Sequence, residues 1–256
     1  MRYKRVLLFF VILVVLYFIA NSGIPMKGMV GKAIAEDKKQ DFSFENAILT
    51  RVVDGDTIEA QVEGYNETWK IRMLGINTPE KGKPFSGEAK NFLTQFENKS
   101  IQLLRDFEDT DMYKRKLRYV FYENRLLNKE ILENGLANKY YYSGLIYTQE
   151  LIDAEKYARE NQLGIWTKSQ EACANCISLI EVNTTGDFFR IKNDCGFNCE
   201  LEGWFVKDAG RKIVKLSAIN SGNEQTYTSK EDIWNNNGDQ LFMFDKSGLL
   251  VIYYAY

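Results

Sequence analysis

Three short apolar segments, separated by turn residues, constrain the fold of this chain more than any other feature. Residues 48–53, 57–62 and 68–74 alternate or run apolar, and Asp-Gly and Gly-Tyr-Asn-Glu stand between them. Asp-Gly between alternating hydrophobic residues is a strong hairpin signal, because glycine takes a positive φ without strain. We therefore expect a series of short antiparallel strands.

Helical patterns follow these strands. Residues 87–99 place four apolar side chains on one helical face, residues 127–135 predict a short helix ending at Gly135, and residues 147–166 predict a longer one. Residues 116–122 predict another strand. Strands feeding a curled sheet with helices beside it indicate an α+β domain around a barrel, which we expect at residues 41–168.

The composition changes after Trp166. Short strand-like segments at 176–182, 187–193, 199–210, 211–216 and 239–256 are spaced by turn residues, which predicts an all-β sandwich at residues 172–256.

The N-terminus has the pattern of a targeting segment. Three cationic residues precede fifteen apolar ones from Val6 to Ala20, so residues 1–40 are expected to hold a membrane anchor or a cleaved signal, followed by a linker. Either one predicts an extracytoplasmic protein, membrane-anchored or secreted.

All four cysteines lie in one region: Cys173, Cys176, Cys195 and Cys199. In an exported chain this spacing predicts two disulfides, with the connectivity open. The same spacing would suit a four-cysteine zinc site in the cytosol.

The chain contains no histidine, and its formal charge is −2. Serine–histidine and cysteine–histidine catalysis and histidine-bound zinc are therefore excluded. The net charge argues against a protein that coats nucleic acid by bulk electrostatics.

One constellation of polar residues suggests chemistry. Pairing the strands about residues 64–67 places Asp56 roughly opposite Gly75, so that Asn77, Thr78 and Glu80 leave the sheet beside it. These are oxygen donors of the kind that Ca²⁺ prefers. Arg72 faces the same region, and oxygen ligands beside an arginine suit a phosphate that bridges metal and guanidinium. The simpler reading is that Asp56 only ends a turn and that Arg72 and Glu80 form a structural ion pair.

The ordered motifs VVDGDTI, IRMLGINTPE, DMYKRKLRYVF, NGLANKYYY and LGIW resemble the staphylococcal nuclease (thermonuclease) family over roughly residues 42–166. The resemblance implies an OB-fold barrel and Ca²⁺-dependent hydrolysis of phosphodiester bonds. It implies that Asp56 and the carbonyl of Thr78 bind metal, and that Glu80 activates water. It also implies that Arg72 and Arg115 bind phosphate, and that Tyr113 and Tyr141 contact the nucleotide.

This chain departs from the family pattern at three positions. Asn77 stands where the family has a second ligating aspartate, so we expect weaker metal binding rather than none, with Asp54 compensating from nearby. Met112 replaces a phosphate-contacting lysine. Lys114 replaces a glycine and is a candidate to restore positive charge beside Arg115, although a solvated lysine would fit the same pattern.

The C-terminal residues LEGWFVKDAGRK and NNGDQLFMFD resemble the lamin-tail domain family, which implies an immunoglobulin-like sandwich. The sequence therefore predicts an exported nuclease, expected to be a monomer, acting on DNA, RNA or both. The alternatives are an OB-fold module that binds nucleic acid with little or no catalysis, and a surface binding protein led by the sandwich.

Overall fold

The computed structural model describes residues 43–140, 144–229, 233–235 and 238–256. Residues Phe42–Tyr256 form one compact unit, separate from Met1–Asp41. The predicted N-terminal anchor or signal and the candidate residue Tyr141 lie outside the described residues. Among the described residues, no helix is both long and apolar enough to span a membrane.

Five strands form a closed barrel. They are β1 (Phe44–Asp54), β2 (Thr57–Val62), β3 (Thr68–Met73), β5 (Ser100–Thr110) and β6 (Lys116–Tyr122), in the order β3-β2-β1-β5-β6. Parallel pairing between β3 and β6 closes the barrel, and β7 (Arg125–Leu126) extends β6. This architecture confirms the predicted OB-fold barrel.

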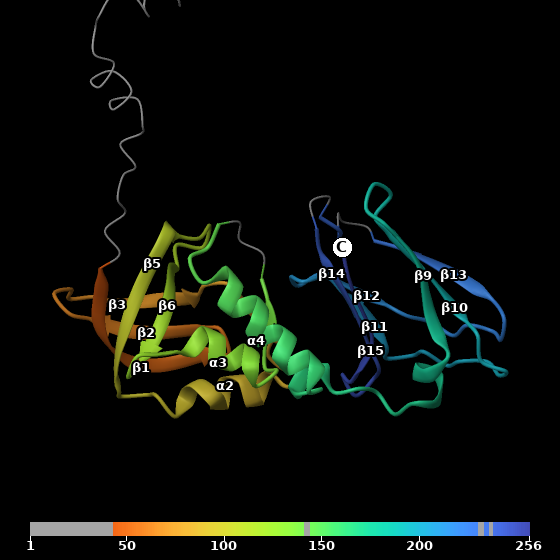
Figure 1. The fold of residues 1–256 in the computed structure, drawn as a ribbon, viewed down its shortest axis with the longest axis horizontal. Coiled ribbons are helices and arrows are strands. Elements are labelled where there is room, and N and C mark those ends of the chain that lie inside the picture. Colours follow the sequence, from red (N-terminus) through yellow and green to blue (C-terminus); the bar gives the residue numbers. More distant parts are fainter. Residues whose placement is uncertain (1–42, 141–143, 230–232, 236–237) are drawn as a thin grey trace, which may run out of the picture. The chain divides into compact units, whose positions relative to one another are not determined.

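Three helices pack beside the barrel (Figure 1). Helix α2 (Ser86–Thr94) packs against β1, and α3 (Leu127–Glu133) packs against β6 and against α4 (Thr148–Glu160). Ala89 and Leu93 bury one face of α2, as their helical spacing predicts, and Phe96 just beyond it is also buried. Gly135 follows α3 with a φ of 66°, the left-handed conformation that commonly ends a helix.

A short two-stranded sheet adjoins the barrel. Strand β4 (Ile76–Asn77) pairs antiparallel with β8 (Asn138–Lys139), so Asn77 lies opposite Asn138. The predicted strand register is off by two residues, since the amide of Met73, not Gly75, donates to the carbonyl of Asp56.

Two further antiparallel sheets follow the barrel in the chain (Figure 1). One has the order β13-β10-β9, formed by Glu224–Thr228, Phe188–Asn193 and Ile177–Asn183. The other has the order β12-β11-β14-β15, formed by Ile213–Lys215, Phe205–Lys207, Gln240–Phe244 and Leu250–Ala255. Buried side chains from both sheets share one hydrophobic core, as a sandwich requires.

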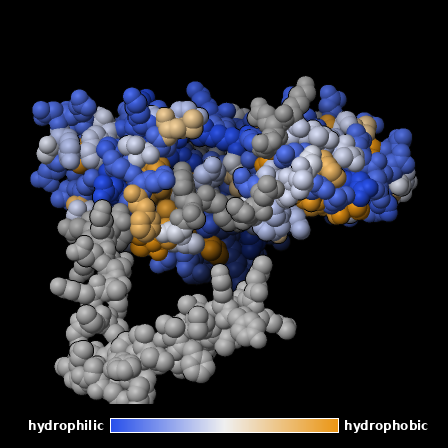
Figure 2. Space-filling model, turned by 90° about the horizontal axis from the view of Figure 1, so that it is seen from above, coloured by the Kyte–Doolittle hydropathy of each residue, from blue (hydrophilic) through white to orange (hydrophobic). Residues whose placement is uncertain are grey.

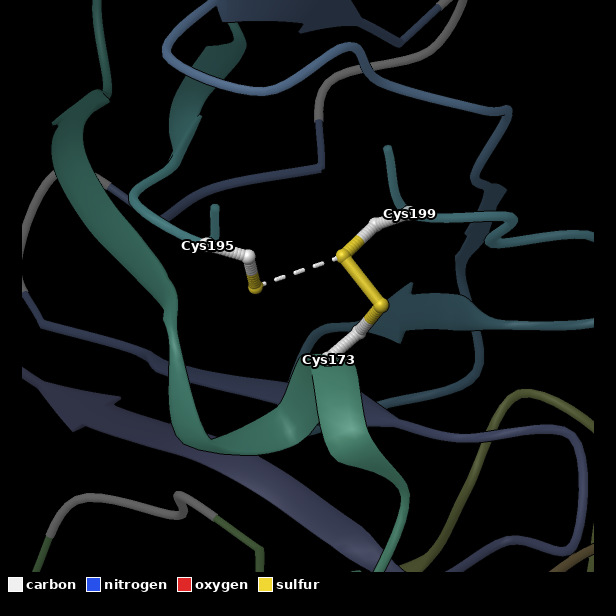
Figure 3. A group of neighbouring side chains, drawn as sticks. All are labelled: Cys173, Cys195 and Cys199. Carbon is white, nitrogen blue, oxygen red and sulfur yellow. Dashed lines mark hydrogen bonds between the residues drawn. A yellow bond between two sulfur atoms is a disulfide. The ribbon is translucent and has the colours of Figure 1, made fainter. Parts of the chain in front are cut away.

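Both predicted disulfides are present, joining Cys173 to Cys199 and Cys176 to Cys195. Figure 3 shows the first bond, with the sulfur of Cys195 3.4 Å from that of Cys199. Their position at the start of the sandwich ties the short 3-10 helix η2 (Ala172–Asn175) to the loop after β10.

A third apolar cluster joins barrel and sandwich. Ala158 and Ile165 pack with Trp166, which is fully buried, and with Phe242, Phe244 and Leu250 of the second sheet. On the face seen in Figure 2, the surface is largely hydrophilic, with hydrophobic side chains gathered in separate patches. This cluster, shared by barrel and sandwich, could not be predicted from local sequence patterns, because its members are up to 92 positions apart in the chain, from Ala158 to Leu250.

Candidate active site

The turn between β1 and β2 places Asp56 beside the loop that follows β4. Gly55 is required there for space, not for a positive φ: a Cβ atom on Gly55 would lie 2.6 Å from the Cβ of Ala89 and 2.8 Å from Oγ1 of Thr78. The expected reason for this glycine was therefore wrong. The close approach brings the backbone amide of Thr78 within 3.2 Å of Oδ2 of Asp56.

Asp56 and Arg72 form a buried ion pair at the centre of the site. Nη2 of Arg72 lies 3.0 Å from Oδ2 of Asp56, and neither side chain is more than 6% exposed. The same nitrogen lies 3.4 Å from Oδ1 of Asn77. The structure thus brings together Asp56, Arg72, Asn77 and Thr78, which the sequence places in one constellation.

Arg115 joins this group through a hydroxyl. Its Nη1 donates to Oγ1 of Thr57 over 3.4 Å, and that hydroxyl donates to Oδ1 of Asp56 over 3.0 Å. Asp111 holds Arg115 with a 2.7 Å ion pair and accepts its backbone amide. Burial acts to raise the pKa of the Asp111 carboxyl, but these hydrogen bonds and the charge of Arg115 lower it.

Of the candidate nucleotide-contacting residues, Tyr113 and Lys114 belong to the described part of the chain, and both lie on the turn before Arg115. Tyr113 is 68% exposed, and its ring lies 5.4 Å from the Arg115 guanidinium carbon. Lys114 is exposed and has a φ of 62°, a conformation in which glycine is favoured. The backbone at this position thus has a conformation that glycine adopts without strain, and the lysine side chain is exposed to solvent.

The donor set of this site fits a hard cation. Asp56, the amide oxygen of Asn77 and the carbonyl of Thr78 are oxygen donors on converging segments, with one buried carboxylate among them. A second acidic group lies close by, since Oδ1 of Asp54 accepts the backbone amide of Asp56 over 3.3 Å. Burial, with the charge of Asp56, raises the pKa of this Asp54 carboxyl. These residues fit Ca²⁺, with less negative charge than two aspartates would give.

Glu80 lies at the rim of the site and is half exposed. Its Oε1 lies 2.7 Å from Nε of Arg211, a residue of the sandwich. Asn77, Thr78 and Glu80 line one pocket together with Lys207, Gly210 and Arg211. The last three residues were not predicted from the sequence, because no local pattern links them to a site more than a hundred positions earlier.

Comparisons with known proteins identify the family of this chain. The family model described as staphylococcal nuclease homologue matches residues 70–168. A thermonuclease of Staphylococcus intermedius is 33% identical over 136 residues, covering 50% of this chain and 80% of that protein. A thermonuclease of Staphylococcus hyicus is 32% identical, covering 46% of this chain and 74% of that protein. Endonuclease YncB of Bacillus subtilis is 32% identical, covering 54% of this chain and 69% of that protein.

The family model covers Arg72 and Arg115, and the chain covers most of each relative's length. The chain therefore belongs to the staphylococcal nuclease family.

Proposed function

We propose that this protein is a Ca²⁺-dependent nuclease that hydrolyses phosphodiester bonds of DNA, RNA or both. Relatives that are thermonucleases and an endonuclease support the hydrolase activity. The observation that carries the proposal is the buried Asp56–Arg72 pair, connected through Thr57 to Arg115, in a barrel of this family.

The roles of the side chains follow from their chemistry. Arg72 and Arg115 bind the phosphate oxygens, where two guanidinium groups stabilise developing negative charge. Glu80 accepts the proton of the attacking water, since no histidine is available for that step. Tyr113 and Lys114 contact the nucleotide from the turn before Arg115, as Tyr141 does from the segment after β8.

Asp56, Asn77 and Thr78 would hold the metal ion. Bound there, Ca²⁺ would act as a Lewis acid on the phosphate and lower the pKa of the attacking water. One carboxylate instead of two predicts a lower affinity, because ligand charge is one of the properties that set Ca²⁺ affinity.

A cleavage assay tests this proposal. The purified full-length chain is incubated with single-stranded DNA and with RNA, in Ca²⁺ and in excess chelator. We expect cleavage in Ca²⁺, loss of cleavage in chelator and recovery when Ca²⁺ is restored. Cleavage that is indifferent to chelator would remove the metal from the mechanism.

A second candidate function is nucleic-acid binding without hydrolysis. It is favoured by Asn77 in place of a second acidic ligand. Retention of labelled single-stranded DNA by a chain that cleaves neither substrate would support this alternative.

We also propose export, with the chain membrane-anchored or secreted and monomeric. The basic and apolar N-terminus and the two disulfides support export, since disulfides persist in oxidising compartments. For the sandwich we propose a lamin-tail-like domain, supported by its LEGWFVKDAGRK and NNGDQLFMFD segments. A surface-binding role led by this domain stays the third candidate, tested by whether the protein holds to cells after its N-terminal segment is removed.

A further inference from the structure

The turn between β11 and β12, residues 208–212, reaches from the sandwich into the candidate active site. We propose that this turn is part of the site, that Arg211 on it is a positioning residue for Glu80, and that Asn77 carries an amide because it must hold the turn. The proposal deepens the nuclease function proposed above and rests on it.

Asn77 binds the turn with its amide nitrogen. Nδ2 of Asn77 donates to the carbonyl of Ala209 over 3.1 Å and to that of Gly210 over 3.0 Å. Carbonyl oxygens only accept hydrogen bonds, so the nitrogen has to face the turn and the oxygen has to face Arg72. An aspartate at position 77 could not donate, and its charge would face two carbonyl oxygens.

Asn138, directly opposite Asn77 in the β4–β8 pair, binds the same turn. Its Nδ2 donates to the carbonyl of Ala209 over 2.9 Å, and its Oδ1 accepts from Nζ of Lys207 over 3.0 Å. Both asparagines are at most 3% exposed. Two buried asparagine side chains on paired strands therefore donate to the same carbonyl of the sandwich, which indicates a specific contact between barrel and sandwich.

Hydrogen bonds within the sandwich fix the backbone of residues 208–212. Oδ1 of Asp239, a fully buried side chain, accepts the amide of Ala209 over 3.2 Å, and Oδ1 of Asp208 accepts the amide of Lys212 over 3.0 Å. Because the backbone on both sides of Arg211 is held in this way, only the side chain of Arg211 has to be ordered to place its guanidinium.

Arg211 binds Glu80 from this fixed support. An ordinary exposed ion pair contributes little, largely because two long side chains must be ordered to form it. Here Arg211 already has its backbone held, and Glu80 lies two residues after Thr78, whose amide is bound to Asp56. The ion pair with Arg211 thus holds the Glu80 carboxylate in one position beside the site.

Cleavage kinetics of the full-length chain test the role of Arg211. We expect Arg211→Ala to lower kcat about tenfold, part of the range that a general base contributes, with KM changed less than about threefold. Arg211→Lys should recover part of the loss. The matched control is Arg125→Ala, which removes an arginine of similar exposure from an ion pair with the less exposed Glu130 in the barrel and should leave kcat unchanged. An unchanged or increased kcat in Arg211→Ala would overturn the positioning role.

Hydrogen exchange tests the role of Asn77 without any need for activity. In Asn77→Asp we expect the amides of residues 208–212 to exchange about tenfold faster or more, because two hydrogen bonds are lost and a charge is introduced. Unchanged exchange would overturn the docking role even in an active enzyme.

The same variant separates docking from metal binding. If docking is the main role of position 77, Asn77→Asp lowers kcat at saturating Ca²⁺. An unchanged or raised kcat at a lower Ca²⁺ requirement would assign the position to the metal alone and contradict the proposal. A wild-type chain that cleaves nothing would remove the nuclease function, and with it the role of Arg211, while the exchange result would still decide the docking.

Discussion

At the scale of single residues, the grouping of Asp56, Arg72, Asn77 and Thr78 could be predicted from the sequence. The spacing from Asp56 to Arg72 and Thr78 indicates one strand pair and the loop after it. The structure brings the guanidinium of Arg72 and the backbone amide of Thr78 within hydrogen-bonding distance of the Asp56 carboxylate. The two residues that the sequence could not explain are Gly55 and Asn77. Gly55 is needed because Ala89 and Thr78 pack against it, and the partners of Asn77 lie in the sandwich.

The role of Glu80 can be tested by an isosteric change. We expect Glu80→Gln to lower kcat by about 10²- to 10⁴-fold, the contribution of a general base, while the chain still binds single-stranded DNA. Because the pair with Arg211 is between exposed side chains, the variant should fold normally. Turnover near that of the wild type would remove Glu80 from the mechanism.

At the scale of helices and strands, regular patterns were predictable and irregular ones were not. The helices α2, α3 and α4 and strands β2, β3 and β6 follow from their apolar spacing. Strand β5 was missed, because its pattern breaks where Asp106 is buried and Phe107 is exposed. Strand β13, sequence EQTYT, was missed because it is polar and buries only Tyr227.

The two disulfides at the start of the sandwich can be tested by mass spectrometry and by substitution. Mass spectrometry of the intact protein should show four fewer hydrogens than after reduction, with peptides joined Cys173 to Cys199 and Cys176 to Cys195. Replacing Cys173 and Cys199 by serine should lower the free energy of unfolding by about 2–4 kcal/mol. Stoichiometric zinc bound to four free thiols would contradict this assignment.

Lys207 on strand β11 predicts how the stability of the protein depends on pH. Burial lowers the pKa of Lys207 to about 8, from an ordinary value of 10.5, although nearby carboxylates including Asp208 oppose the shift. The unfolded chain therefore binds more protons between these values, and the contribution of Lys207 to stability rises as pH increases from 8 towards 10.5. Relative to Lys207→Met, the wild-type free energy of unfolding should rise over this window by at most about 3 kcal/mol.

Denaturant unfolding at several pH values measures this difference. The exposed Lys215 on β12 provides the control, since Lys215→Met should follow the wild-type curve. Burial raises the pKa of the adjacent Asp208 to about 6, from an ordinary value of 3.8. The contribution of Asp208 to stability therefore changes in the opposite direction, and it is lost as pH rises from about 4 through 6. Parallel curves for the wild type and Lys207→Met above pH 8 would show that Lys207 is not perturbed.

At the scale of the whole molecule, barrel and sandwich contribute to one site. Sequence patterns are local, whereas Asn77 and Ala209 are 132 positions apart and meet only after both parts have folded. The sequence therefore predicts an oxygen-donor site on the barrel but not the turn that covers part of it. Asn77, which at the level of sequence only weakens a metal site, also binds the sandwich in the structure.

The most direct test of the metal-dependent nuclease is a Ca²⁺ titration of cleavage with Asp56→Asn. This change removes the one buried carboxylate of the donor set, so the Ca²⁺ concentration for half-maximal cleavage should rise at least tenfold, with activity barely restored at saturation. Asp153→Asn, an exposed carboxylate on α4, is the matched control and should reproduce the wild-type curve. If the titration of Asp56→Asn coincides with that of the wild type, Asp56 does not bind the metal, and the account of this site is wrong.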